Sequence, residues 1–160
     1  MGVRSGRGTA SWSGSTARRD SSGGSGAMPD YASRGLLSQI AGVPQIDLDA
    51  MIDRKLKRFM GDAAAYAYVA MRDAIADAGL AIDRIRHPRC GVIAGSGGGS
   101  AQWQIETGDV LREKGMRRIA PYMVPRTMCS TVSATLATAF GLLGLSYSIA
   151  AHCATAAHCI

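Results

Sequence analysis

The chain has 160 residues, of which 47% are hydrophobic and 19% are charged, a composition that suits one globular domain with a sizeable core. Its net charge of +6 indicates an acidic partner, such as nucleic acid, anionic lipid or an acidic protein. The four cysteines form no CxxC pair and no apolar signal sequence is visible, so we expect reduced thiols in a cytoplasmic protein.

Residues Met1–Ala27 are rich in serine, glycine and arginine and contain only scattered apolar side chains. Such a segment buries too little surface to offset the entropy of ordering its backbone, so we expect a disordered tail. The ordered domain is therefore predicted to run from residue 28 to residue 160.

At the start of this domain, Pro29-Asp30 and Gly42-Val43-Pro44 predict turns, and Ser38–Ile40 is a candidate short strand.

The clearest helical pattern spans Met51–Gly79, where apolar residues recur every three or four positions. Asp62, after Gly61, is expected to cap a second part of this helix, and Gly79 is expected to end it. The first part carries a run of basic residues, which is usually a solvated face but can be a docking patch for an acidic partner. The expected apolar face consists of Ile52, Leu56, Phe59 or Met60, Ala63, Ala67, Ala70 or Met71, Ala74 and Ala78.

A short strand, Cys90–Ala94, precedes the glycine-rich stretch Gly95–Ser100 and a predicted helix over Ala101–Lys114. Glycines between a strand and a helix can bind a phosphate, but this stretch lacks the Lys-Ser/Thr pair of a P-loop and does not fit GxGxxG. We therefore expect a tight turn with close backbone packing. A second helix, made of small residues, is predicted over Thr127–Phe140.

The apolar stretch Val132–Ala151 is about as long as the roughly 20 residues that a membrane-spanning helix needs. Its serines, threonines and glycines, and the change of period at Gly144, instead favour a buried helix followed by a buried strand. We expect no membrane span. The element order, helix–strand–helix–helix–strand–helix, indicates an α/β layered fold with buried strands.

The alternating pattern of Leu145–Ala150 predicts a strand, and Cys153 follows in a turn before an alanine-rich helix start. Unpaired N–H groups at such a helix start favour a thiolate, which is the nucleophilic form of cysteine. The same junction can form an elbow that exposes the side chain. A buried cysteine in a core helix is the alternative that the residues leave open.

Three segments resemble the type I β-ketoacyl-acyl-carrier-protein synthases, which are condensing enzymes of the thiolase-like fold. They are IDRKLKRFMGDAAAYAYVAMRDAIADAGL (Ile52–Leu80), GVIAGSGGGS (Gly91–Ser100) and YSIAAHCATAAHCI (Tyr147–Ile160). The resemblance implies that residues 28–160 form part of the N-terminal half of this α/β fold, which would be incomplete. It also implies a synthase of fatty acid biosynthesis, which joins an acyl thioester to malonyl carrier protein by decarboxylative Claisen condensation.

By this resemblance, Cys153 is the nucleophile that holds the acyl chain, and its own backbone N–H is one oxyanion-hole donor. Met128 matches a position near the acyl pocket at a homodimer interface, and the strand Ser146–Ala150 would pair across the two-fold axis. No cofactor, metal, nucleic acid or membrane is implied. Acidic acyl carrier protein is the implied partner, docking on Arg54, Lys55, Arg58, Lys114 and Arg117.

The sequence departs from the family in three places. The tail Met1–Ala27 does not resemble the family's opening strand, which suggests a different reading frame; translation of the upstream DNA tests this. His152 replaces a small residue, and we expect it to crowd the turn or to reflect a sequence error rather than to act in catalysis. The family's two catalytic histidines, its lysine and the second oxyanion donor match nothing up to Ile160, so we expect a fragment that cannot condense alone. The alternative is a non-catalytic or misfolded fragment that offers at most an interaction surface.

Two other interpretations remain. His152, Cys153, His158 and Cys159 cluster within eight residues, but adjacent His-Cys pairs do not match the ligand spacings of tetrahedral zinc sites. The basic charge suits nucleic acid, but the chain has no aromatic-interleaved basic patch, zinc finger or helix-turn-helix pattern.

Overall fold

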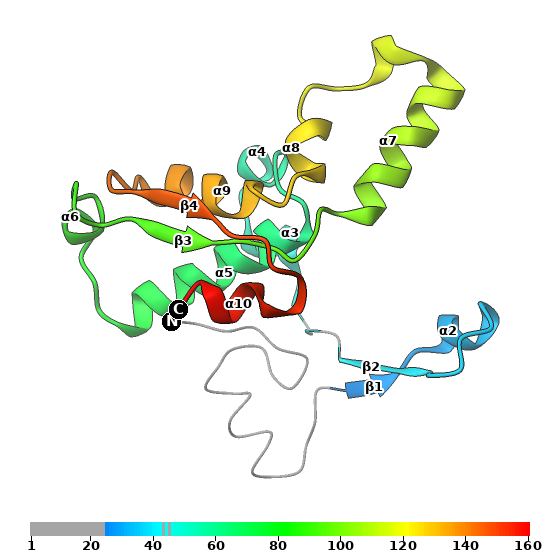
Figure 1. The fold of residues 1–160 in the computed structure, drawn as a ribbon, viewed down its shortest axis with the longest axis horizontal. Coiled ribbons are helices and arrows are strands. Elements are labelled where there is room, and N and C mark those ends of the chain that lie inside the picture. The colour runs from blue at the N-terminus through cyan, green and yellow to red at the C-terminus, as the bar shows by residue number, and fades with distance from the viewer. Residues whose placement is uncertain (1–24, 43, 45) are drawn as a thin grey trace.

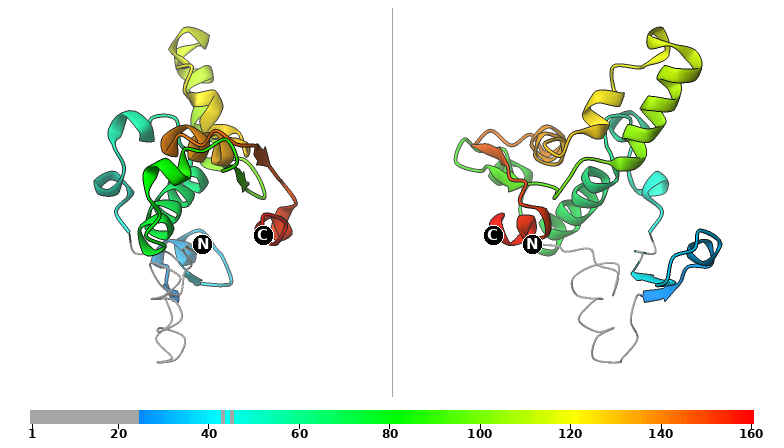
Figure 2. Two further views of the ribbon diagram at one scale, coloured as in Figure 1. Left: turned by 90° about the vertical axis from the view of Figure 1, so that its left-hand side faces the viewer. Right: turned by 45° about the vertical axis from the view of Figure 1, so that its right-hand side comes forward.

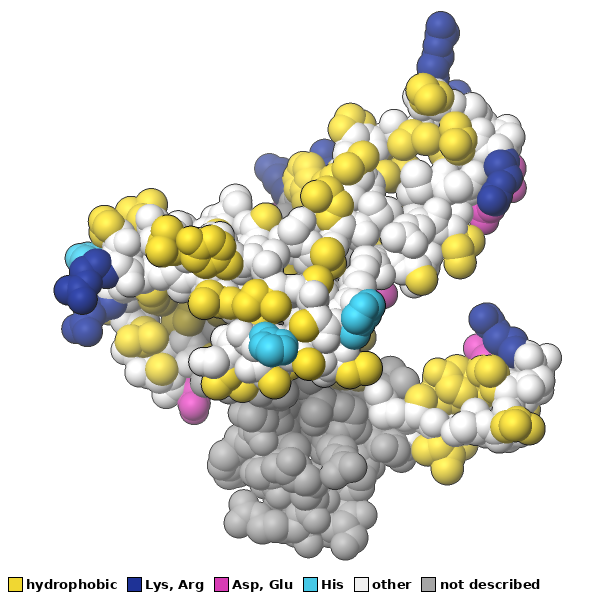
Figure 3. All heavy atoms as spheres, viewed as in Figure 1, with side chains coloured by type: hydrophobic (Ala, Val, Ile, Leu, Met, Phe, Trp, Pro, Cys, Tyr) yellow, Lys and Arg dark blue, Asp and Glu magenta, His cyan; other side chains and the backbone are white. Residues whose placement is uncertain are grey.

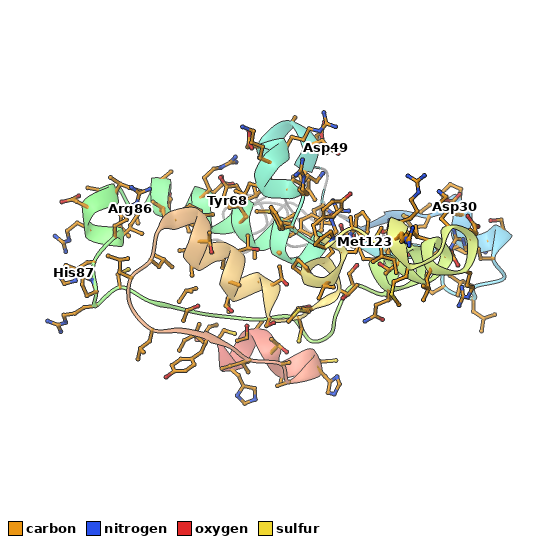
Figure 4. The ribbon with its side chains drawn as sticks, turned by 90° about the horizontal axis from the view of Figure 1, so that it is seen from above. Asp30, Asp49, Tyr68, Arg86, His87 and Met123 are labelled. Carbon is orange, nitrogen blue, oxygen red and sulfur yellow. The ribbon has the colours of Figure 1, made fainter. Side chains whose placement is uncertain are left out.

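The computed structural model describes residues 25–42, 44 and 46–160. Two helices, α5 (Asp62–Asp77) and α9 (Thr131–Phe140), pack against each other and hold most of the core (Figure 1). The strands β3 (Val92–Ala94) and β4 (Ser146–Ser148) form a parallel pair beside α9. Helix α10 (Thr155–His158) lies on the other side of these strands (Figures 1 and 4). The α/β class is therefore confirmed.

The core joins small side chains of α5 to branched side chains of α9. Tyr68 on α5, which is labelled in Figure 4, also stacks on Phe140, with ring centroids 5.3 Å apart. Close packing of this kind explains why α5 is rich in alanine, since small side chains let two helix backbones approach. The buried members of the core are Ile52, Met60, Ala64, Ala65, Val69, Val132 and Leu136.

The predicted helix over Met51–Gly79 is wrong in its first part, which forms α3 (Leu48–Met51) and α4 (Arg54–Lys57). The cause is capping. The carboxylate of Asp53 accepts a hydrogen bond of 2.8 Å from the N–H of Lys55 and starts a new helix. Ile52, just before it, is extended.

Helix α5 confirms the predicted break and the predicted end, but not the predicted cap. Gly61 is the N-cap residue, and Asp62 is already helical. At the other end Gly79 has φ +60°, and the N–H of Leu80 donates to the carbonyl of Ile75 at 3.2 Å, as in a Schellman motif. The apolar face was predicted to include Ala63, but Ala63 is exposed, and the neighbouring Ala64 and Ala65 are buried instead.

Helix α7 (Ala101–Lys114) has the predicted bounds, and the hydroxyl of Ser100 caps it. With the following 3₁₀ turn η1 (Met116–Arg118) it forms an arm, Ala101–Arg118, that extends from the core (Figure 2). The chain returns through α8 (Met123–Thr127). The second predicted helix begins four residues late, at Thr131, because the backbone is extended at Met128.

A small lobe precedes the core. The strand β1 (Ser25–Ala27) pairs antiparallel with β2 (Ile40–Gly42), and α2 (Pro29–Ser33) lies between them. Most of the predicted tail lies outside the described residues, but its last three residues form β1. Pro29-Asp30 starts a helix rather than a turn, and the turn expected at Gly42-Val43-Pro44 is only partly described. The remaining short helix is α6 (Ile82–Ile85).

The strands are less buried than predicted. Val92 and Ala94 pack against the core, whereas Ile93 is 46% exposed and Tyr147 is 56% exposed. The expectation of buried strands is therefore wrong for Ile93 and Tyr147. None of the described helices is long and apolar enough to cross a membrane.

Candidate active site

Cys153 lies in a tight turn, which we call the Cys153 turn (Ile149–Thr155), between β4 and α10. Within it, His152–Ala154 form the 3₁₀ turn η2. His152 has φ +47°, a left-handed conformation that few residues other than glycine adopt. This sharp change of direction leaves Cys153 exposed. The predicted elbow is therefore present, and the alternative of a buried core cysteine is wrong.

The buried hydroxyl of Thr155 makes two hydrogen bonds within the Cys153 turn. Thr155 is only 4% exposed. Its Oγ1 accepts a hydrogen bond of 2.8 Å from the N–H of Ala151 and donates one of 2.8 Å to the carbonyl of His152. The hydroxyl therefore bridges the entry and the middle of the turn, on the side away from solvent.

The glycine-rich stretch after β3 packs its backbone against this turn. A Cβ on Gly97 would lie 2.6 Å from the carbonyl oxygen of His152, and one on Gly95 would clash with the carbonyl of Ile149. Side chains at these positions would push the turn away. The expectation of close backbone packing is confirmed.

Two serines connect the end of β4 to the start of α9. The hydroxyls of Ser148 and Ser133 are 2.6 Å apart, and that of Ser148 also donates to the carbonyl of Ser130 at 3.3 Å. Ser133 is 5% exposed. The strand that leads into the Cys153 turn is thus fixed to the core helix.

The five basic residues expected to bind a carrier protein are all exposed, but they form two groups. Arg54, Lys55 and Arg58 are on or next to α4, near the base of the arm, where the carbonyl of Arg58 accepts a hydrogen bond of 2.7 Å from Nε of Arg126. Lys114 and Arg117 are at the tip, where Figure 3 shows basic side chains. Helix α7, whose 14 residues span about 21 Å, forms most of the arm that leads to this tip.

Met128 lies in a cleft of about 290 Å³ between the start of α5 and the start of α7. Its side chain is 50% exposed. Gly98, Gly99 and Thr131 also line this cleft, but Cys153 does not. This cleft therefore does not join Met128 to Cys153.

The sequence model of the family described as "Beta-ketoacyl synthase, N-terminal domain" matches residues 12–160. The chain belongs to the β-ketoacyl synthase family. It is 46% identical over 134 residues to "3-oxoacyl-[acyl-carrier-protein] synthase 1" of Haemophilus influenzae, covering 83% of this chain and 33% of that protein. The chain thus spans about a third of the length of this curated relative.

Two solved structures share the fold. A β-ketoacyl synthase from Burkholderia phymatum superposes with a TM-score of 0.76 at 24% identity, over 98% of this chain and 39% of that one. A ketosynthase solved with a type II polyketide synthase acyl-carrier protein gives a TM-score of 0.55 at 20% identity, over 66% of this chain and 30% of that one. The thiolase-like layered fold of this β-ketoacyl synthase domain is therefore confirmed.

The sequence did not predict two sets of interacting side chains in this β-ketoacyl synthase domain. Thr155 gave only a weak signal, as the single polar side chain between Cys153 and His158. The second group centres on Arg126, whose guanidinium carbon lies 3.8 Å from the ring centroid of Trp103 and 5.0 Å from that of Tyr122. No spacing rule links Arg126 to Trp103, because they are 23 positions apart on different helices.

The histidines of this β-ketoacyl synthase domain are spread out. His152 is in the Cys153 turn and His158 ends α10, whereas His87 lies beside α6, away from α10 (Figure 4). Among the described residues, no three His, Cys, Asp or Glu side chains are placed to hold a metal ion.

Proposed function

We propose that this chain provides the acyl-accepting cysteine of a 3-oxoacyl-[acyl-carrier-protein] synthase of fatty acid biosynthesis. The observation that carries the proposal is the exposed thiol of Cys153 on a left-handed elbow, in a member of the β-ketoacyl synthase family. An elbow of this kind presents a nucleophile to a substrate while the surrounding backbone stays fixed.

In the proposed reaction the Cys153 thiolate attacks the carbonyl carbon of an acyl thioester. A C–S bond forms, and the carbonyl oxygen becomes an oxyanion that the backbone N–H of Cys153 stabilises. The oxyanion then collapses, the C–S bond to the carrier breaks, and the carrier thiolate takes up the proton that Cys153 gave up. Decarboxylation of malonyl carrier protein, and attack of the resulting carbanion on the new thioester, belong to the whole protein.

The exposed basic residues support acyl carrier protein as the partner. We infer docking on Arg54, Lys55 and Arg58 at the base of the arm and on Lys114 and Arg117 at its tip. Two observations support this inference: the net charge of +6, and the structurally similar ketosynthase that was solved with an acyl-carrier protein. Attraction between exposed charges would make binding weaken steeply as salt rises.

A homodimer is also part of the proposal. Leu145, just before β4, and Tyr147, within it, are 72% and 56% exposed, which suits pairing of Ser146–Ala150 with a second copy. Met128 would line the acyl pocket at that interface. We further propose that the protein is cytoplasmic, since Cys90, Cys129, Cys153 and Cys159 are free thiols.

Acylation of the chain tests the proposed function directly. An acyl carrier protein thioester is incubated with the unaltered chain and with Cys153→Ala and Cys159→Ala variants, and intact masses and peptides are measured. We expect one acyl group on Cys153, none on the Cys153→Ala variant and normal labelling of the Cys159→Ala variant. Binding without acylation would leave only an interaction surface and overturn the proposal.

A further inference from the structure

We propose that Thr155 is a positioning residue that aims the backbone N–H of Cys153 at the reacting carbonyl oxygen. This inference rests on the proposed function, because it concerns the oxyanion that forms when Cys153 accepts an acyl group. Thr155 itself is buried and does not touch the substrate. It acts through the peptide unit that joins His152 to Cys153.

The geometry of that peptide unit carries the argument. The carbonyl of His152 and the N–H of Cys153 belong to one planar peptide, and in the trans form they point in opposite directions. The hydroxyl of Thr155 donates to this carbonyl at 2.8 Å from the buried side. The N–H of Cys153 therefore points away from Thr155, toward the exposed side where the thiol lies.

Two further contacts stop the peptide unit from rotating. The Oγ1 of Thr155 accepts the N–H of Ala151 at 2.8 Å, so the hydroxyl proton is directed at the carbonyl of His152. The backbone of Gly97 packs against the same carbonyl, since a Cβ there would lie 2.6 Å from its oxygen. A hydrogen bond accepted by a carbonyl also polarises the N–H at the other end of the peptide and makes it a better donor.

The N–H is free to act because of its place in the helix. Cys153 lies in the first turn of the η2–α10 segment, where backbone N–H groups have no partner within the helix. Thr155 thus converts an unpaired donor at a helix start into one with a fixed direction. Fixed donors stabilise an oxyanion without the cost of reorientation during the reaction.

Two reactions of the same thiol separate this role from a purely structural one. Transfer of an acyl group from an acyl pantetheine thioester forms an oxyanion, whereas alkylation by iodoacetamide does not. The Thr155→Val variant keeps the shape of the side chain but loses the hydroxyl. In this variant we expect acyl transfer to Cys153 to slow at least about tenfold. The effect should be smaller than the loss of about 10²–10³ in rate that follows removal of an oxyanion donor, because the N–H itself remains. Alkylation of Cys153, followed by peptide mass spectrometry, should stay within about twofold, because no oxyanion forms.

The Thr155→Ser variant is the matched control. It keeps the hydroxyl, so its rate of acyl transfer should stay within about threefold of that of the unaltered chain. Equal slowing of both reactions in Thr155→Val would show a structural role and overturn the inference. Unchanged acyl transfer in Thr155→Val would also overturn it. Absence of acyl transfer to the unaltered chain, with alkylation intact, would instead overturn the proposed function.

Amide hydrogen exchange of the unaltered chain tests the geometry even if Thr155→Val does not fold. We expect slow exchange at Ala151, whose N–H is bonded to a buried oxygen, and fast exchange at Cys153, whose N–H faces solvent. Slow exchange at Cys153 would mean that its N–H is turned inward, which overturns the inference.

Discussion

His152 holds a backbone conformation that few side chains adopt, and this has a measurable cost. At φ +47° its Cβ is crowded by the backbone, by roughly 1–2 kcal/mol relative to glycine. Glycine loses more backbone entropy on folding than other residues, and this offsets about 0.5–1 kcal/mol of the stability that a glycine here would gain. The unfavourable contact at this position therefore lies in the backbone of His152 itself.

We predict that His152→Gly raises the free energy of unfolding by up to about 1.5 kcal/mol. His152→Val should instead lower it by about 1 kcal/mol, because β-branched residues are rarely left-handed. Urea unfolding of both variants measures the difference. His158 is the matched control, since it lies in the last turn of α10, and His158→Gly should not stabilise the chain. Equal stability of the glycine and valine variants at position 152 would contradict the prediction.

At the scale of the elements, Arg126 joins three helices that are separate in sequence. Its guanidinium stacks on Trp103 of α7, and its Nε donates to the carbonyl of Arg58 at the end of α4. A planar guanidinium can make both contacts at once, which the ammonium of lysine cannot. The orientation of the arm (Ala101–Arg118) relative to α4 therefore depends on this side chain.

We predict that Arg126→Lys destabilises the chain by about 1–2 kcal/mol, from the lost stacking on Trp103 and the lost hydrogen bond to the carbonyl of Arg58. Chemical unfolding gives the value, and Trp103 fluorescence reports the local change in a Trp12→Phe background. Arg112→Lys is the control, because Arg112 pairs with Asp109 on the surface, at 2.7 Å, and should change stability by less than about 0.5 kcal/mol. A similar effect of both substitutions would rule out a special role for Arg126.

The elements that the sequence predicted well are those whose ends are marked locally. Ser100 and Gly115 flank α7, and Gly79 follows α5, so these boundaries follow from short-range rules. The break before α4 was missed because Asp53 caps a helix inside an apparently continuous apolar pattern. The strand–turn–helix pattern allowed an exposed Cys153 but left a buried one open. The Thr155 bridge and the Arg126 stack depend on tertiary contacts that no periodicity encodes.

At the scale of the whole molecule, α5 and α10 lie on opposite sides of β3 and leave a groove of about 530 Å³ between them. Among the described strands, β3 pairs only with β4, so its other edge faces this groove. The lining is mainly apolar, and Ile160 is 97% exposed. An open strand edge beside apolar surface is a template for association with other chains. The residues that form the groove include Met71, Ile75, Leu80, Val92, Ile93, Leu136, Cys159 and Ile160.

We predict that the 160-residue chain alone self-associates through this groove and binds an apolar dye such as anilinonaphthalene sulfonate. Ile93→Lys places a charge in the groove and should remove most of the dye fluorescence and light scattering. Because Ile93 is 46% exposed, the stability cost should stay below about 1 kcal/mol. Leu37→Lys is the matched control, since Leu37 is fully exposed in the small lobe outside the groove. Dye binding that falls equally in both variants would show that general surface apolarity, rather than the groove, causes the association.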